Sequence, residues 1–242
     1  MKSPEILRDV AQTIEDVEKR INSLKALSDK NKQKALRLLN EAKRNFLELS
    51  ENVAVENEEL ANFFLKRAVR LKNNTNDKYI EKVGEKEFMK DVQAINKYSK
   101  AAPYDFAGEV KALHRAYRAF LFGMIPFYIV SGIFGPMYAF TALILIIPTL
   151  LAMLSLRKRG SLGLMLSFAV MPIPMVMGAF SIRYAIYALS NPEELARIAE
   201  NLGRSISFAQ GVVVLMGILG ALSLVLLGYA SYSLYKHRHA FL

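Results

Sequence analysis

Four prolines inside long apolar segments are the residues of this chain whose positions could support chemistry. Because proline has no N–H, each one leaves a backbone carbonyl oxygen without its helical donor, and transporters bind ions and substrates at helices broken in this way. The alternative is that neighbouring groups bond to the freed carbonyls and the prolines only shape helix packing. The candidates for a pore or a kink are the pair Pro172 and Pro174, together with Pro126 and Pro148.

Ionisable and nucleophilic side chains give less evidence for a catalytic or binding site than the prolines do. The apolar tracts 119–156, 161–189 and 207–235 contain no Asp or Glu, and the chain has no Cys. A carboxylate pair inside these tracts, a cysteine nucleophile and a thiolate metal site are therefore excluded. The sequence also lacks a phosphate-binding loop, a nucleophile elbow and a zinc-binding helix motif. It predicts no enzyme, no cofactor and no metal site.

The three apolar tracts are too long and too apolar for the core helices of a soluble domain, so they predict an all-α integral membrane protein. The tract 119–156 is nearly twice as long as one crossing requires. We expect it to fold back at residues 132–136, where two glycines and a proline interrupt the helix. The predicted transmembrane domain covers 106–242, with spans at about 115–133, 137–156, 161–189 and 207–235.

Basic residues next to the spans predict their orientation. Lys and Arg accumulate in cytosolic connections. With four spans and a cytosolic N-terminus, three basic groups beside the spans all face the cytosol, while the two outer connections carry no charge and a net charge of −1. We therefore predict a multi-pass protein of the plasma membrane with both termini in the cytosol and an amphipathic helix at 192–202 on the outer surface. The residues that determine this topology are Arg115, Arg118, Arg157, Lys158, Arg159, Lys236 and Arg238.

Small residues on the last span permit close approach of another helix, either within the bundle or between copies. Those expected to form the helix contact are Gly217, Gly220, Ala221 and Gly228.

Residues 1–105 are expected to form a separate cytosolic α-helical domain. From Glu5 to Val83 there is neither Gly nor Pro, which favours unbroken helix. A polar break at 28–31 separates two heptad seams, and the second continues as far as Leu71. The two seams would pair as an antiparallel, coiled-coil-like hairpin, within one chain or between chains. The first seam consists of Leu7, Val10, Ile14, Val17, Ile21 and Leu24.

The end of this domain is expected at Pro103, which should break the chain. Asp105 would then begin a last helix that continues directly into the first span.

A charged helical domain joined to four spans is typical of a membrane-anchored scaffold or assembly subunit, which docks a protein partner or a second copy of itself. Two alternatives are a channel or transporter subunit with a site at the third span, and an integral platform subunit of a secretion or pilus-type machine. Besides protein, the expected partner is the lipid bilayer. Nucleic acid is not expected, because the 24 basic residues of 1–118 are interleaved with 19 acidic ones.

The predicted orientation can be tested with single cysteines, since the chain has none of its own. A cysteine replacing Lys158 should resist an impermeant thiol reagent in intact cells, whereas one replacing Ala196 should react with it. Labelling at Lys158 without labelling at Ala196 would overturn the four-span topology.

Overall fold

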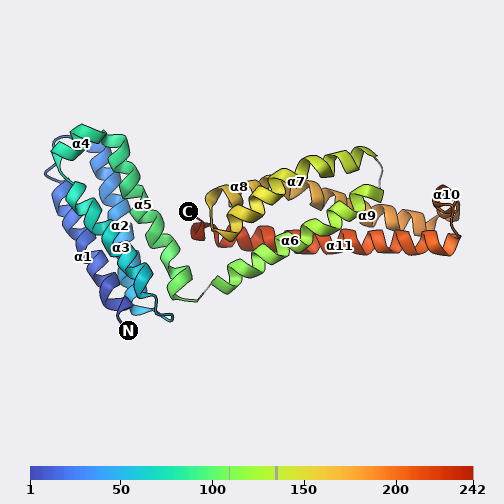
Figure 1. Ribbon diagram of the computed structural model, residues 1–242, viewed down its shortest axis with the longest axis horizontal. Coiled ribbons are helices and arrows are strands. Elements are labelled where there is room, and N and C mark those ends of the chain that lie inside the picture. The colour runs from blue at the N-terminus through green and yellow to red at the C-terminus, as the bar shows by residue number, and fades with distance from the viewer. Residues whose placement is uncertain (109, 134–135, 242) are drawn as a thin grey trace. The chain divides into compact units, whose positions relative to one another are not determined.

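The computed structural model describes residues 1–108, 110–133 and 136–241, and every regular element in these ranges is a helix (Figure 1). Four helical segments are long and apolar enough to cross a membrane: Val110–Ile133, Tyr138–Arg157, Ser161–Ser190 and Ile206–Lys236. The prediction of an all-helical chain with four candidate spans is therefore confirmed. The chain divides into two compact units, which we call unit 1 (Met1–Lys111) and unit 2 (Ala112–Phe241).

Unit 1 is built from four long helices around one apolar core. The helices are α1 (Ser3–Ile21), α2 (Asp29–Glu51), α3 (Glu58–Asn74) and α5 (Glu85–Phe106), with the short α4 (Asp77–Val83) before the last of them. Helix α1 packs against α2 and α3, and α2 also packs against α5. All six residues of the first predicted seam are buried, and they share a core with Phe46, Phe64, Phe88 and Phe106.

The expectation of unbroken helix between the polar break and Leu71 is wrong, because the chain leaves the helical conformation between Glu51 and Glu58. Contacts with distant residues stabilise this turn. The backbone N–H groups of Ala54 and Val55 donate to the Phe106 carbonyl at 2.9 and 2.8 Å. The side chain of Asn57 accepts from the Leu60 N–H and caps α3.

Pro103 does not break the chain as expected. Helix α5 continues through it to Phe106, whose fully buried ring belongs to the core of unit 1. The helix ends just beyond, where Gly108 adopts a φ of +76°. Tertiary contacts of Phe106 therefore outweigh the loss of one helical hydrogen bond at Pro103. The following helix α6 begins at Val110, so it is not capped by Asp105.

Carboxylates from the second half of unit 1 cap the helices of its first half. Glu56 accepts from the backbone N–H groups of Lys2 and Ser3 and from the Ser3 hydroxyl, at 3.1, 2.8 and 2.8 Å. Glu85 accepts in the same way from the N–H and hydroxyl of Ser28, and also from the Asn31 side chain. These negative charges lie at the N-terminal ends of α1 and α2, which favours both helices.

Unit 2 contains the helices α6 (Val110–Ile133), α7 (Pro136–Arg157), α8 (Ser161–Val170), α9 (Pro172–Ser190), α10 (Pro192–Leu202) and α11 (Ile206–Lys236), followed by the 3₁₀ turn Arg238–Ala240. The long α11 packs along α9, while α7 packs against α8. Phe134 and Gly135, at the centre of the predicted turn 132–136, lie outside the described residues.

The helix expected at 192–202 is α10, and its ends explain its bounds. The Asn191 side chain accepts from the N–H groups of Glu193 and Glu194, and Pro192 occupies the first turn. Gly203, in the left-handed conformation with φ +60°, ends the helix.

The capping carboxylates make unit 1 sensitive to acid. Hydrogen bonds from Ser3 lower the pKa of Glu56 below its ordinary 4.5, and hydrogen bonds from Asn31 and Ser28 do the same for Glu85. Their contribution to stability is complete above pH 4.5 and is lost as the pH falls through the lowered pKa. The melting temperature of residues 1–111, measured by circular dichroism, should therefore decrease when the pH is lowered below 4.5. It should fall less in the Glu56→Gln/Glu85→Gln variant, and equal pH dependence in both proteins would contradict this role.

Candidate functional site

Two of the four candidate prolines come together where three helices of unit 2 meet. Pro126 of α6 and Pro174 of α9 are both buried and line one small space, together with residues of α11. We call this place the three-helix junction and define it by Pro126, Pro174, Gly178, Ser181, Gly220 and Ser223.

Backbone contact between α9 and α11 closes one side of the junction. A Cβ atom added at Gly178 would lie 2.7 Å from the Gly220 carbonyl oxygen, and one added at Gly220 would lie 2.6 Å from the Gly178 oxygen. Farther along the same pair, a Cβ at Gly217 would approach that of Ala185 to 2.9 Å. The two helices therefore touch through positions that have no room for a side chain.

The third helix is held by a hydrogen bond in the turn that precedes Pro126. The buried Ser223 hydroxyl of α11 donates to the Gly123 carbonyl of α6 at 2.8 Å. A Cβ at Gly123 would lie 2.8 Å from the side chain of Leu227, so α6 also approaches α11 closely. The Ser223 hydroxyl thus bonds to the backbone one turn before the proline; the carbonyl that Pro126 itself leaves without a helical donor is the neighbouring one, of Phe122.

The proline pair does not unwind its helix. Met171, between α8 and α9, keeps helical dihedrals of −59° and −34°, and its N–H still donates to the Ser167 carbonyl at 3.0 Å. Pro172 is exposed and does not line the junction. Pro148 is half-buried on α7, beside Thr149, whose hydroxyl accepts from Tyr128 at 2.9 Å. The four prolines therefore form no single site.

The junction leaves almost no free volume. The space between its residues measures about 10 Å³, and a single buried water needs about 10–15 Å³. Both hydroxyls already donate their protons, Ser181 to the Met177 carbonyl and Ser223 to the Gly123 carbonyl. Within the described ranges, no group of three or more His, Asp or Glu is placed to hold a metal ion. The junction therefore packs three helices together and leaves little room for a solute.

The predicted packing residues of α11 are divided between two faces. Gly217 and Gly220 contact α9, whereas Ala221 is exposed and a Cβ at Gly228 would meet nothing within 4 Å. The partner residues on α9 were not predicted. The sequence contains a pattern that could have predicted them, since small residues recur on α9 with spacing 3, 4, 3. These residues are Gly178, Ser181, Ala185 and Ala188.

The two ends of unit 2 differ in charge. The start of α6, the α7–α8 turn and the end of α11 lie together at one end, and α10 lies at the other (Figure 1). The first end therefore carries all seven basic residues predicted to determine topology. At the opposite end, Glu194 of α10 is nearly buried and accepts from the Tyr184 hydroxyl of α9 at 2.9 Å, which fixes α10 to the bundle.

Comparison of the chain with known protein families, curated proteins and solved structures finds no match.

The close contact of α9 and α11 predicts opposite effects for the same substitution at two sites. Gly220→Ala should destabilise unit 2 by about 1–3 kcal/mol, because the new methyl group meets the Gly178 carbonyl oxygen. Gly228→Ala on the same helix should be neutral or stabilising by up to about 1 kcal/mol, since its Cβ has open space. Thermal denaturation of the full chain in detergent would measure both changes. If the two variants shift equally, the contact does not limit stability.

Proposed function

We propose that the chain is a multi-pass protein of the plasma membrane that acts as a scaffold or assembly subunit. In this proposal unit 2 inserts in the bilayer with its basic end and both termini in the cytosol. Unit 1 is a cytosolic helical bundle that docks a partner protein.

Exposed apolar side chains support membrane insertion. Phe140, Ile147 and Val225 of unit 2 are 65%, 67% and 68% exposed, which a water-soluble protein would not favour over so large an area. The distribution of charge supports the orientation, because the basic residues gather at one end of unit 2 and α10, with three glutamates, lies at the other.

The closed three-helix junction is the observation that carries the choice of a scaffold over a channel or transporter subunit. A transport site needs space for its solute and polar groups that bind it. Here the prolines surround about 10 Å³, and the hydroxyls beside them already donate to backbone carbonyls. The membrane helices then serve to hold unit 1 at the bilayer.

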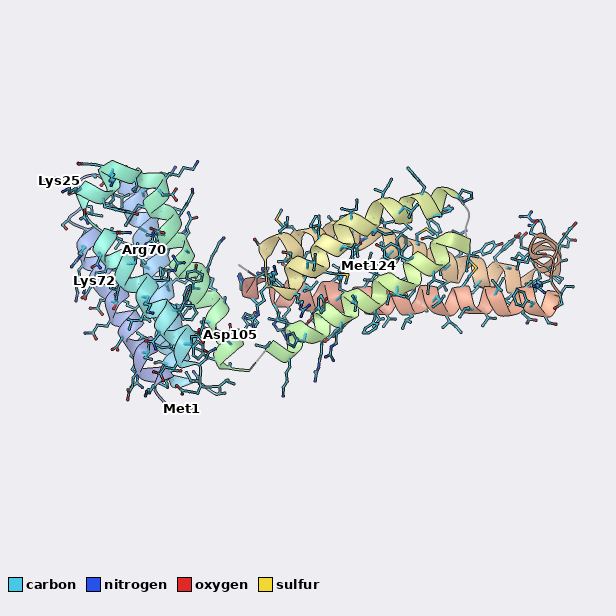
Figure 2. All side chains as sticks on the ribbon, in the orientation of Figure 1. Met1, Lys25, Arg70, Lys72, Asp105 and Met124 are labelled. Atoms are coloured by element: carbon cyan, nitrogen blue, oxygen red, sulfur yellow. The ribbon has the colours of Figure 1, made fainter. Side chains whose placement is uncertain are left out.

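The outer face of α3 is the proposed docking surface. A shallow groove follows this helix, and Lys66, Val69 and Arg70 are exposed along it. Figure 2 labels Arg70 on this helix. The described residues that line the groove include no carboxylate. An exposed apolar residue between two cations complements an acidic segment of another protein that also carries an apolar side chain.

A photo-crosslinking residue in place of Val69, in cells that make the protein, tests this docking. The expected product is a crosslink to a protein whose attachment site, mapped by mass spectrometry, is acidic. The Lys66→Glu/Arg70→Glu variant should lose it, because the new charges repel the partner. Lys34→Glu/Arg37→Glu, with the same change of charge on α2, should keep it. A crosslink insensitive to the first variant, or no crosslink, would count against the scaffold function.

Flux measurements test the alternative. Purified protein in liposomes should pass neither ions nor small solutes, and Pro172→Ala/Pro174→Ala should change nothing. Flux that depends on these prolines would favour the channel or transporter subunit instead.

A further inference from the structure

One charged residue lies inside the apolar tracts of unit 2. Arg183 of α9 is the single Lys, Arg, Asp or Glu within the three apolar tracts of the sequence. It is exposed, and it makes no hydrogen bond or ion pair with any residue that the structure describes. The nearly buried carboxylate of α10 is bonded elsewhere, because Glu194 accepts from Tyr184 and Arg197. A cation without a partner in an apolar segment is unfavourable in a bilayer and is typical of functional positions.

The contact between α9 and α11 gives the depth of Arg183 in the bundle. Gly178 of α9 meets Gly220 of α11, and Ala185 meets Gly217. Arg183 lies between Gly178 and Ala185 and is therefore level with the same part of α11. At 1.5 Å per residue, this part begins about 16 Å from one end of α11 and about 24 Å from the other. Arg183 is thus well inside the apolar length of the helix pair.

Arg183 belongs to an exposed stripe on the side of α9 opposite the residues that contact α11. The residues of this stripe recur with spacing 3, 4, 3, 4, which is the spacing of helices that pack along one another. We call it the α9 stripe and define it by Ile173, Val176, Phe180, Arg183 and Tyr187. Val176, Phe180 and Tyr187 are 54%, 54% and 53% exposed. The described part of the chain therefore leaves this stripe free for one further helix.

We propose that the α9 stripe packs against a membrane-spanning helix of another integral membrane protein, and that this helix carries an Asp or Glu that pairs with Arg183. Such a pair neutralises the cation and forms charge-assisted hydrogen bonds, which are strong in apolar surroundings. A second copy of this chain lacks the required group, because its apolar tracts contain no Asp or Glu. The inference rests on the insertion of unit 2 proposed above, and it adds a partner within the membrane to the scaffold function.

The phosphate of a lipid headgroup is the other group that could neutralise Arg183. Side chains on an α-helix lean toward its N-terminus, and α9 runs toward α10. The Arg183 side chain is therefore favoured to lean toward Phe180 and the middle of the tract, away from headgroups at the α10 end. This direction favours a carboxylate on a neighbouring helix over a headgroup phosphate.

A photo-crosslinking residue in place of Phe180, one turn from Arg183, tests this contact in cells that make the full chain. The expected product is a crosslink to an apolar segment of an integral membrane protein, and mass spectrometry should place the attachment within two turns of an Asp or Glu. Arg183→Gln should reduce this product about tenfold, the effect of losing a hydrogen bond between charged groups. Arg183→Lys should keep most of it. Arg183→Glu should abolish it, and replacing the partner's mapped carboxylate by lysine should restore it.

Matched controls are available in unit 2. Ile218 of α11 is exposed at the same depth, and a photo-crosslinking residue in its place should give no product that depends on Arg183. Arg204 is exposed outside the apolar tracts, so Arg204→Gln should leave the Phe180 product unchanged. Crosslinks only to phospholipid, to a second copy, or to a protein segment without a carboxylate would overturn the proposal.

Alkaline extraction of the membranes separates this inference from the proposed function. If alkali releases the chain, unit 2 is not inserted and both are contradicted. If the chain stays in the membrane and crosslinks through Val69, but gives no protein product through Phe180, the scaffold function stands and the partner helix at the α9 stripe does not exist.

Discussion

Direct backbone contact between α9 and α11 is the constraint on which the arrangement of unit 2 depends. Where Gly178 meets Gly220, each helix lacks the side chain that would hold the other away. This close approach continues toward Ala185 and keeps the two helices together over several turns. With α11 fixed along α9, its Ser223 hydroxyl is in position to bond to the backbone of α6. Close packing at this pair of glycines therefore contributes to the placement of three of the four candidate spans.

Proline inside apolar helices has two possible uses, and the surroundings decide between them. A freed carbonyl in an open, polar cavity can bind an ion, whereas one that is covered by neighbouring helices only shapes the fold. Around Pro126 and Pro174 the space is too small for a solute, and the nearest hydroxyls are already bonded. The same prolines would have a different meaning if α9 and α11 were held apart by side chains at Gly178 and Gly220.

Local sequence patterns predicted the elements of this chain better than their contacts. The cap at Asn191 and the stop at Gly203 are local signals, and the bounds of α10 agree with them. The turn after Glu51 could not be read in the same way, since the Phe106 carbonyl that stabilises it is about fifty residues distant. The prediction that Pro103 breaks the helix was wrong for the same reason, because α5 continues through it to Phe106, which packs against residues distant in sequence. Of the three-helix junction, the prolines and Gly220 could be recognised from sequence, but which prolines share a space depends on how the helices are placed.

The capping pattern of unit 1 has a consequence for the order in which the chain folds. Helices α1 and α2 are made first, yet the carboxylates at their N-terminal ends belong to Glu56 and Glu85. During synthesis α1 therefore lacks its capping carboxylate until Glu56 has been made, and α2 lacks its own until Glu85 begins α5. Glu85 is followed only some twenty-five residues later by the first apolar helix at Val110. The last capping carboxylate of unit 1 is therefore made only shortly before the first candidate span, so little of the chain separates completion of this bundle from the synthesis of that helix.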